Sequence, residues 1–227
     1  MALHRCYGTG NSDLLQYLQR KGILKTYKVF NTMSQVDRGK YVCSGNAYMD
    51  APASIGYGAT ISAPHMHAHA LEHLADKLQD GGKVLDVGFG SGYLTVCLAL
   101  MVGPKGVSVG IEHIPQLKEI ATKNIENDHP ELLETGKVEL VVGDGRLGYL
   151  PQAPYDAIHV GAAAPEVPEN LISQLALGGR MIIPIGSSGD QMLYQIDKTI
   201  DGTIHKQSLM GVIYVPLTDK EYQISKS

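Results

Sequence analysis

Cysteine is scarce in this 227-residue chain, and the few cysteines are far apart. Cys6, Cys43 and Cys97 are odd in number and lack the close pairs of metal sites and disulfide frameworks. No base or oxyanion motif surrounds any of them, which argues against a catalytic thiol. The pattern favours a reduced, cytosolic setting.

Long apolar runs and long runs of one charge are also missing. No stretch approaches the roughly 20 apolar residues that span a bilayer, and the first residues contain no apolar segment of signal-peptide length. The formal net charge is −4, so neither a nucleic acid nor a membrane surface is expected as a partner. Hydrophobic residues make up 44% of the chain, which is ordinary for a globular protein with a buried core.

The chain divides into two unlike parts, without internal repeats. Residues 1–80 predict a helical N-terminal extension packed on the core, with an irregular middle. Residues 81–227 predict an α/β domain. Residues 38–62 show little periodicity and predict a long ordered loop, a kind of segment that in compact domains is usually functional.

Helices of the first part are predicted from caps and breakers. Ser12 and Asp13 could cap a helix that Gly22 ends. A second short helix is expected over 26–36, and a third from Pro64, because proline is favoured in the first turn.

The second part alternates short apolar strands with helical segments. Helices are expected over 91–102, 114–128 and 168–177, and strands over 83–88, 106–112, 137–144, 155–162 and 178–186. Segments 191–198 and 205–215 predict a closing antiparallel pair. This alternation predicts a Rossmann-like, doubly wound and mostly parallel sheet, buried on both faces.

A glycine-rich turn carries the strongest local signal. Gly88, Gly90 and Gly92 follow a strand and open a helix, where tight turns let a ligand approach the backbone. A dinucleotide fold would require the spacing Gly-x-Gly-x-x-Gly, whereas this turn is Gly-x-Gly-x-Gly. Asp86, two residues earlier, suits the cationic sulfonium and ammonium of S-adenosylmethionine. A turn without a ligand remains the plainer alternative.

Acidic residues also close the next two strands. Glu112, followed by His113, could accept both hydroxyls of a ribose, a device that nicotinamide enzymes share. Asp144 could accept from an adenine amino group, with Gly145 giving access to the backbone. Each could be a solvated side chain or an ordinary turn, but acidic residues closing three successive parallel strands are harder to attribute to chance.

Several stretches together resemble the protein-L-isoaspartate O-methyltransferase family. They span nearly the whole chain and comprise Tyr48-Met-Asp-Ala-Pro52, Ala59-Thr-Ile-Ser-Ala-Pro-His-Met-His67, Leu85-Asp-Val-Gly-Phe-Gly-Ser-Gly92, Val141-Val-Gly-Asp-Gly-Arg146, Tyr155-Asp-Ala-Ile-His-Val-Gly-Ala-Ala-Ala164 and Val215-Pro-Leu-Thr-Asp-Lys-Glu221. The run Thr-Ile-Ser-Ala-Pro-His-Met is far more specific to the family than the glycine turn.

The resemblance implies a class I S-adenosylmethionine-dependent methyltransferase in which Ser62 is the active-site serine. By position it also implies a set of cofactor contacts, which with the glycine turn comprises Ala59, Thr60, Ile61, Ser62, His67, Asp86, Gly88, Gly90, Ser91, Glu112, His113, Asp144, Gly145, Thr218 and Gln223. Phe89, where a small residue is common, could change the packing under the turn.

The implied reaction methylates the α-carboxylate of L-isoaspartyl residues, and the β-carboxylate of D-aspartyl residues, in damaged peptides and proteins. The ester can close to a succinimide, which begins a repair. The nucleophile is already an anion at neutral pH, so Ser62 needs only to orient it. We expect a monomer, because a protein substrate needs open access. Another carboxylate substrate, an inactive cofactor-binding module and a nicotinamide oxidoreductase are the alternatives.

Other interpretations of these residues need to be weighed. On position alone, Ser62 is more readily a helix cap, and only the family resemblance argues against that interpretation. His65, His69 and His73 share one helix face, but no partner motif accompanies them, so no metal site is predicted. His159 is expected to be a satisfied core histidine rather than a catalytic group.

Overall fold

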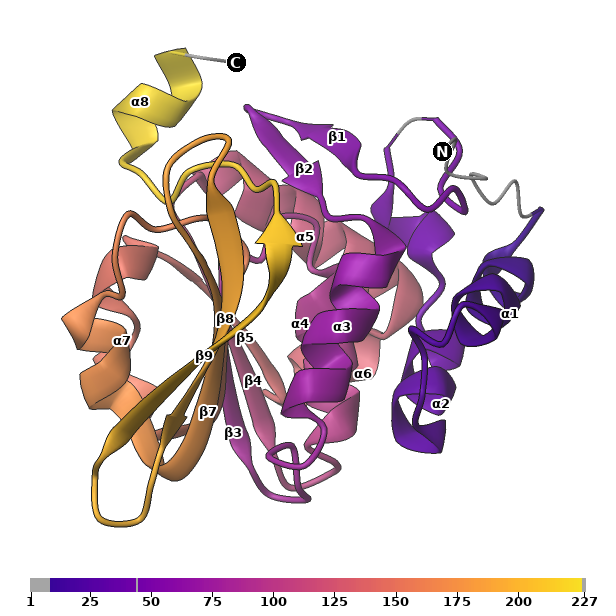
Figure 1. Cartoon of the computed structure of the whole chain (residues 1–227). Helices are drawn as coiled ribbons and strands as arrows, with labels where there is room; N and C mark the ends of the chain where they lie inside the picture. The colour runs from indigo at the N-terminus through magenta and orange to yellow at the C-terminus, as the bar shows by residue number, and fades with distance from the viewer. Residues whose placement is uncertain (1–8, 44, 226–227) are drawn as a thin grey trace.

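A central sheet organises the molecule. The computed structural model describes residues 9–43 and 45–225, and within these ranges seven strands form one sheet in the order β5-β4-β3-β6-β7-β8-β9 (Figure 1). The strands are β3 (Lys83–Val87), β4 (Val107–Glu112), β5 (Val138–Val142), β6 (Tyr155–Val160), β7 (Leu175–Ile185), β8 (Gln191–Lys198) and β9 (Ile204–Val212). The first five pair in parallel, whereas β8 and β9 are antiparallel. The expected doubly wound sheet and its closing pair are confirmed.

Apolar side chains cover both faces of the sheet. On β3, Val84 belongs to one buried cluster and the next residue, Leu85, to the other, because successive side chains of a strand point to opposite faces. One face is covered by α3 (Pro64–Leu74), α4 (Tyr93–Met101), α5 (Pro115–Asp128) and α6 (Pro130–Glu134), and the other by α7 (Glu169–Gln174) (Figure 1). The near-continuous apolar strands thus reflect burial from both sides.

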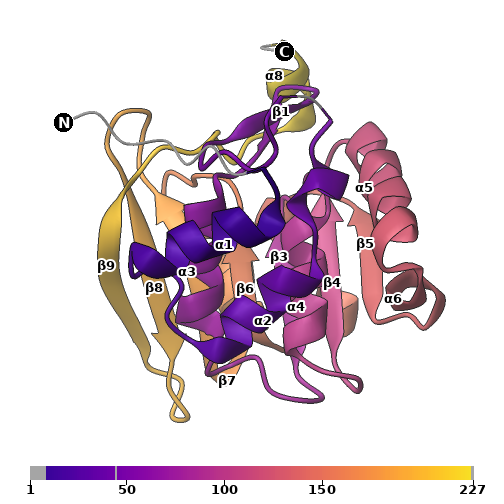
Figure 2. The same ribbon diagram turned by 90° about the vertical axis from the view of Figure 1, so that its right-hand side faces the viewer.

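The N-terminal helices form an outer layer on the helical face. Figure 2 shows α1 (Asn11–Arg20) and α2 (Tyr27–Gln35) in front of α3 and α4. Leu18 and Met33 from these helices are buried in the same cluster as Val96 of α4. The N-terminal segment therefore shares its core with the α/β part.

The first two helices begin in different ways. Thr26 caps α2, because its side chain accepts a hydrogen bond from Val29 N. In α1 the N-cap is Gly10, without a side-chain cap, so the cap predicted at Ser12 and Asp13 was wrong. Asp13 lies inside the first turn, where its carboxylate accepts hydrogen bonds from Thr9.

The segment 38–62 contains more regular structure than its sequence predicts. A 3₁₀ helix spans Arg38–Tyr41, and a two-stranded hairpin follows, β1 (Ala53–Gly56) with β2 (Ala59–Ile61). Tyr57 and Gly58 make the turn with positive φ angles of 54° and 68°. Strands this short cannot display the alternation by which a strand is found in a sequence.

The helix predicted over 168–177 was too long. It ends at Gln174, since Leu175 pairs with Tyr155 and already belongs to β7. Two 3₁₀ turns, Gly145–Leu147 and Leu150–Gln152, and helices α6 and α8 (Lys220–Ser225) had not been predicted. All four are three to six residues long, and only sustained periodicity can be detected in a sequence.

Candidate active site

The acidic residues singled out in the sequence lie at neighbouring strand ends. Asp86 lies near the end of β3, Glu112 is the last residue of β4, and Asp144 follows β5 by two residues. These strands are adjacent. The chain leaves β3 for β4 and β5 on one side and returns to β6 and β7 on the other, which makes the edge between β3 and β6 a topological switch point. Ligands of open α/β sheets bind at such points.

The glycine turn leaves room for a ligand above the end of β3. Gly88, Gly90 and Gly92 have φ angles of 76°, 52° and 86°, which side chains strongly disfavour. A Cβ on Gly88 would meet no atom within 4 Å, whereas one on Gly90 would lie 3.0 Å from Ile55 Cδ1 of the hairpin. The backbone at Gly88 therefore faces open space, and the hairpin packs beside the turn.

Phe89 fills space beneath the same turn. Its side chain is buried, and its Cδ1 would lie 2.7 Å from a Cβ on Gly110. Phe89 thus takes the space left by Gly110 of β4, so that both residues determine the packing of the turn.

Asp86 does not present a free carboxylate to a ligand. It is 1% exposed, its Oδ2 accepts a hydrogen bond from Thr95 at 2.6 Å, and its Oδ1 lies 2.8 Å from Nδ1 of His159. The sequence suggested that Asp86 faces the cationic end of a cofactor. In the structure it lies in the pocket wall, and its contact with a ligand would run through His159.

Glu112 is anchored by backbone N–H groups. Its Oε1 accepts from His113 at 2.8 Å and from Ile114 at 3.2 Å, and its Oε2 accepts from Gly90 at 3.4 Å. Burial raises the pKa of Glu112, and the hydrogen bond from Ile114 is the largest opposing effect. This fixed carboxylate can still accept from ribose hydroxyls, because an ionised carboxylate has several acceptor positions.

Three segments meet beside Glu112. His113 Nε2 lies 2.8 Å from Gln223 Oε1 of α8, and Gln223 Nε2 donates to the carbonyl oxygen of Tyr57 at 2.9 Å. We call this set, His113, Gln223 and Tyr57, the latch. It joins the end of β4, the C-terminal helix and the tip of the N-terminal hairpin.

Asp144 is engaged by Arg146 in this structure. Arg146 donates to both carboxylate oxygens, with an Nη2–Oδ2 distance of 2.7 Å, and the hydrogen bonds from Arg146 lower the pKa of Asp144. A Cβ on Gly145 would meet Val87 Cγ1 at 2.5 Å and Leu217 Cδ1 at 3.8 Å. Thr218 follows Leu217, whose N–H donates to Ala163.

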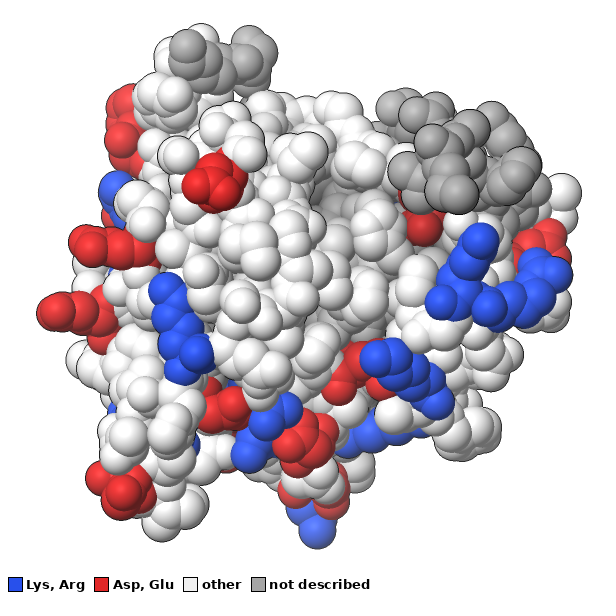
Figure 3. Space-filling view, in the orientation of Figure 1, with Lys and Arg blue, Asp and Glu red and all other residues white. Residues whose placement is uncertain are grey.

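Two cavities meet at the start of α3. The smaller, about 30 Å³, lies between the glycine turn and the hairpin, with Ser91, Tyr93 and His159 in its wall. The larger, about 930 Å³, lies between α3 and the ends of β8 and β9, where Figure 3 shows a hollow surrounded mostly by uncharged side chains. Both are lined by Thr60, Ser62 and Gly161.

Ser62 lies at the boundary between the two cavities. The N-cap of α3 is Ala63, and no side chain caps this helix, so Ser62 is not a helix cap. Its hydroxyl lies where it can donate to the phenol oxygen of Tyr214, which also lines the larger cavity. Burial raises the pKa of Tyr214 to about 12, with the bond to Ser62 opposing. The Ser62 hydroxyl is therefore not used as a helix cap, and it lies beside the protonated phenol of Tyr214.

The remaining N-terminal residues surround the smaller cavity. Ala59, Thr60 and Ile61 form β2, and Thr60 and Ile61 line the cavity. His67, on α3, also lines it, 4.9 Å from Tyr93 between ring centroids. Behind it Arg38, 1% exposed, donates to the carbonyl oxygens of Ala47 and Ala51.

Most histidines of α3 have their own partners. His65 Nδ1 lies 2.8 Å from Asp50, and His73 Nδ1 lies 3.3 Å from Gln195. Within the described ranges no group of three or more His, Cys, Asp or Glu side chains has the geometry to hold a metal ion. His159 has one ring nitrogen paired with Asp86, so the sequence was right about its burial and only partly right about its being satisfied.

Two observations concern the whole described chain. None of the helices within it is both long and apolar enough to cross a bilayer. Cys43 is an exposed free cysteine and Cys97 a buried one, while Cys6 lies outside the described residues.

The comparison with known families agrees with this geometry. Residues 9–222 match the family model of protein-L-isoaspartate(D-aspartate) O-methyltransferase. The chain belongs to this family. It is 50% identical over 224 residues to a protein-L-isoaspartate O-methyltransferase of Caenorhabditis elegans, covering 98% of this chain and 99% of the relative. The Triticum aestivum enzyme is 51% identical over 96% and 95% of the two chains.

A solved structure has the same fold. It is a Plasmodium falciparum protein described as a protein-L-isoaspartate O-methyltransferase, in complex with S-adenosyl-L-homocysteine. It is 40% identical, covers 93% of this chain and 99% of its own, and superposes with a TM-score of 0.87. The fold is therefore that of a class I S-adenosylmethionine-dependent methyltransferase.

Sequence reasoning missed several residues of the site. Arg38, Thr95 and Tyr214 are neither part of a recognisable motif nor close in sequence to the groups that they contact. Tyr57 contributes only its carbonyl oxygen, which any residue could supply. Nothing in the sequence indicated that Arg38 is buried, since arginine is usually a surface residue.

Proposed function

We propose that this chain transfers a methyl group from S-adenosylmethionine to the free α-carboxylate of L-isoaspartyl residues, and to the β-carboxylate of D-aspartyl residues, in damaged peptides and proteins. The resulting ester closes to a succinimide and begins a repair. Family membership supports the reaction, and the complex of the Plasmodium falciparum relative with S-adenosyl-L-homocysteine supports the cofactor.

The observation that carries the proposal is the position of Ser62 between two cavities. A methyl transfer needs the donor and the acceptor on opposite sides of one point. The smaller cavity, beside the glycine turn, is on the donor side, and the larger one, with its mostly uncharged wall, is on the acceptor side. Thr60, Ser62 and Gly161 form the boundary that both reactants reach.

The residues present fit the cofactor. Gly88 leaves space for a ligand against its backbone, and Glu112 offers a fixed carboxylate one strand away. Ala59, Thr60, Ile61, Ser62, His67, Ser91, His113, Asp144, Gly145, Thr218 and Gln223 complete the proposed contacts. When bound, the cofactor supplies an electrophilic methyl group on a cationic sulfur.

The chain's own task is then to position an anion. The α-carboxyl of an isoaspartyl residue has an unperturbed pKa of about 3.3–3.7, so at neutral pH it is already the nucleophile. Ser62 turns its hydroxyl from the phenol oxygen of Tyr214 to the substrate, and the hydrogen bond that it then donates aims one carboxylate oxygen. Alignment of reactants alone can supply effective molarities of about 10⁵ M or more.

The larger cavity suits a peptide held by its backbone. Asp190 is the only carboxylate in its wall, and no Lys or Arg is among the described lining residues. Pro52 from the N-terminal segment and Ile213 and Val215 from the C-terminal segment also line it. We therefore propose broad tolerance of the residues beside the isoaspartate, which peptides of varied flanking sequence would test.

The setting of the enzyme is also a proposal. A cytosolic monomer fits the two free cysteines, Cys43 and Cys97, and a cavity that must admit a protein segment. No nucleic-acid or membrane partner is proposed. Size-exclusion chromatography with light scattering would test the monomer, and an apparent mass near twice 24.4 kDa would contradict it.

Paired peptides test the reaction. With methyl-labelled cofactor, the isoaspartyl peptide should acquire base-labile label, and the matched normal aspartyl peptide should not. Ser62→Ala should lower kcat/KM by about tenfold to a hundredfold, because a hydrogen bond to a charged group contributes about 1.5–3 kcal/mol. It should leave the affinity for S-adenosylhomocysteine within threefold. Label in both peptides, or in neither, would refute the proposal.

A further inference from the structure

Two buried histidines face the smaller cavity from opposite elements. His67 comes from α3 and His159 from β6, and each is 6% exposed and lines the cavity. Each ring has one nitrogen held by a charged residue behind it, Arg38 for His67 and Asp86 for His159. The nature of that partner determines what the other nitrogen can offer to a ligand.

The partner of His67 is a donor. Arg38 Nη1 lies 3.5 Å from Nδ1 of His67, and a guanidinium has only donors. Nδ1 must therefore accept, and the hydrogen of a neutral ring lies on Nε2. Burial, and then the charge of Arg38, lower the pKa of His67 well below its ordinary value, which keeps the ring neutral. His67 therefore offers an N–H donor to the cavity.

The partner of His159 is an acceptor. Asp86 accepts from Thr95 through Oδ2, at 2.6 Å, and faces Nδ1 of His159 with Oδ1. Nδ1 therefore carries the hydrogen, and Nε2 of a neutral ring carries the lone pair. Nε2 has no hydrogen-bond partner among the described residues. His159 thus offers an acceptor to the same cavity.

The topology indicates which end of the cofactor meets this pair. Glu112 and Asp144, the proposed contacts of ribose and adenine, follow β4 and β5 on one side of β3. His159 lies on the other side, paired across the sheet with Asp86. An extended cofactor that reaches Ser62 with its methyl group directs its amino-acid end toward β6 and α3, where the two histidines lie.

We propose that His159 and His67 together recognise the amino-acid end of the cofactor, with Nε2 of His159 accepting from its ammonium and Nε2 of His67 donating to its carboxylate. Asp86 is then a positioning residue, which fixes the ring of His159 and adds a negative charge behind it. This inference rests on the proposed cofactor site. It explains why Asp86, with both oxygens engaged, is buried at the switch point.

Substitution of each histidine by asparagine tests the role of Nε2 separately from that of Nδ1. The asparagine amide can replace Nδ1, donating to Asp86 or accepting from Arg38, but has nothing at the position of Nε2. Calorimetry would compare S-adenosylhomocysteine with its analogues lacking the amino group or the carboxyl group. The wild type should prefer the complete ligand about tenfold or more over each analogue, because both lost hydrogen bonds involve a charged group.

The two variants should fail in different ways. His159→Asn should lose the preference over the deaminated analogue and keep the preference over the decarboxylated one, and His67→Asn should show the reverse. His159→Gln, whose amide oxygen can reach the Nε2 position, should regain part of the amino preference. This partial rescue, with thermal unfolding of each variant, separates recognition from a loss of folding.

Other outcomes would overturn the inference. If His159→Asn loses discrimination against the decarboxylated analogue instead, the ring donates to the cavity and the assignment is wrong. If both asparagine variants discriminate as the wild type does, the amino-acid end binds elsewhere. Glu112→Ala distinguishes this failure from that of the whole site, because unchanged affinity in that variant would show that the cofactor does not bind at the strand ends at all.

Discussion

The hydroxyl of Tyr214 is the polar group of the larger cavity that lies beside Ser62. Burial raises the pKa of its phenol to about 12, and the hydrogen bond from Ser62 opposes this rise, so the phenol stays protonated at neutral pH. A serine with a fixed neighbour loses less orientational freedom when a substrate carboxylate arrives. The proposed active-site serine thus has a polar neighbour that lies 152 positions away in the sequence.

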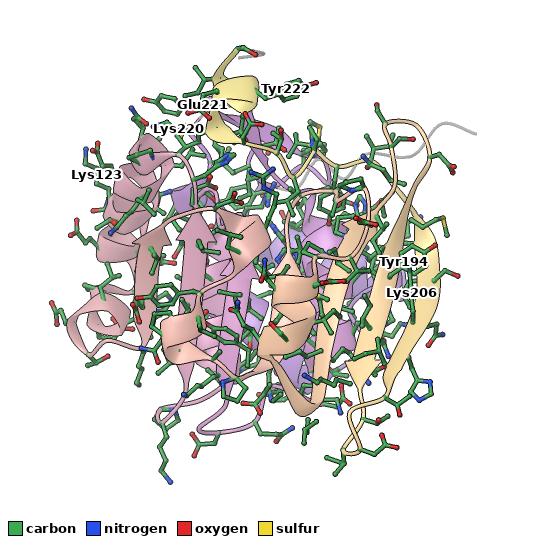
Figure 4. All side chains as sticks on the ribbon, turned by 90° about the vertical axis from the view of Figure 1, so that its left-hand side faces the viewer. Lys123, Tyr194, Lys206, Lys220, Glu221 and Tyr222 are labelled. Atoms are coloured by element: carbon green, nitrogen blue, oxygen red, sulfur yellow. The ribbon has the colours of Figure 1, made fainter. Side chains whose placement is uncertain are left out.

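Removing that hydroxyl should slow methyl transfer without affecting the cofactor. Tyr214→Phe should lower kcat by about threefold to tenfold, the effect of one neutral hydrogen bond, and leave the affinity for S-adenosylhomocysteine unchanged. The matched control is Tyr194→Phe, because Tyr194 contacts Lys206 on the strands β8 and β9 (Figure 4), with Nζ 4.0 Å from the ring centroid. Equal rates for both variants would remove Tyr214 from the site.

Asp50 links stability to pH. Burial alone would raise its pKa, but the hydrogen bonds from His65 and the charge of Arg38 lower it below the ordinary value. A carboxyl with a depressed folded-state pKa stabilises the protein above the unfolded value, near 4, and this contribution is lost as the pH falls through the folded value.

The expected effect of Asp50→Asn follows from that sign. The free energy of unfolding should fall by about 1–3 kcal/mol at pH 7, and the difference from the wild type should shrink as the pH falls below the ordinary carboxyl pKa of about 3.9. Urea unfolding across this range would measure it. Asp80→Asn is the control, because its contact with Lys105 is 3.8 Å long and exposed, and such pairs contribute less than about 1 kcal/mol. A pH-independent loss in Asp50→Asn would contradict the linkage.

For single residues, the sequence predicted the members of the site that belong to motifs. It missed those that lie far away in the sequence and contact the site only in the folded chain. The placement of Glu112 and Asp144 at neighbouring strand ends follows from alternation alone, since parallel strands end at one edge. The proposed role of Ser62 rests on family resemblance. Nothing in the sequence linked Arg38 to His67 or Tyr214 to Ser62, because a contact between distant residues leaves no local pattern.

Elements meet at the latch. The hairpin β1–β2 and helix α8 are far apart in the sequence, yet Gln223 of the helix donates to the carbonyl oxygen of Tyr57, 166 positions away, in the hairpin. Figure 4 shows Lys220, Glu221 and Tyr222 projecting from α8 at the top of the molecule, above the carboxyl edge of the sheet. The latch therefore joins a short hairpin and a short helix beside Glu112, the proposed ribose contact.

Opening the latch should speed cofactor release. Gln223→Ala removes the hydrogen bonds to His113 and Tyr57, and we expect the dissociation rate of S-adenosylhomocysteine to rise about tenfold, since each bond contributes about 0.5–1.5 kcal/mol. Stopped-flow displacement would measure the rate. Gln16→Ala, on the exposed face of α1, is the control. An unchanged rate in Gln223→Ala would show that the latch does not confine the cofactor.

The elements themselves were largely predictable. Long segments with clear periodicity, such as α5 and β3, were found within one or two residues, because burial on a fixed face imposes the pattern. The hairpin at Ala53–Ile61 was not, since its strands are too short to alternate and its order depends on packing against Gly90. The end of α7 was misplaced because pairing with β6 overrides local helix preference at Leu175.

The whole molecule is held by one continuous core on its helical face. Leu18 of α1, Leu71 of α3 and Leu98 of α4 belong to the same buried cluster and are each 0% exposed. We therefore expect the N-terminal extension and the α/β part to unfold together, although their sequences differ in character.

A substitution in α1 tests that expectation. Leu18→Ala should lower the free energy of unfolding by about 2–5 kcal/mol, the usual effect of a cavity in a core, and keep a single transition. Circular dichroism and tyrosine fluorescence should follow the same curve. Tyr27→Ala, 82% exposed, should change stability by less than about 0.5 kcal/mol. Two separated transitions in Leu18→Ala would indicate independent domains.

The boundary between the cavities has a consequence for inhibitor design. Cofactor and peptide would occupy separate spaces that share only Thr60, Ser62 and Gly161, so a bisubstrate inhibitor must place its linker through this opening. A Cβ on Gly161 would already approach Gly88 O at 3.0 Å. A slender, unbranched linker should therefore bind better than a bulky one. Its length should match the distance between the donor sulfur and the acceptor oxygen, so that the inhibitor combines the affinities of both halves.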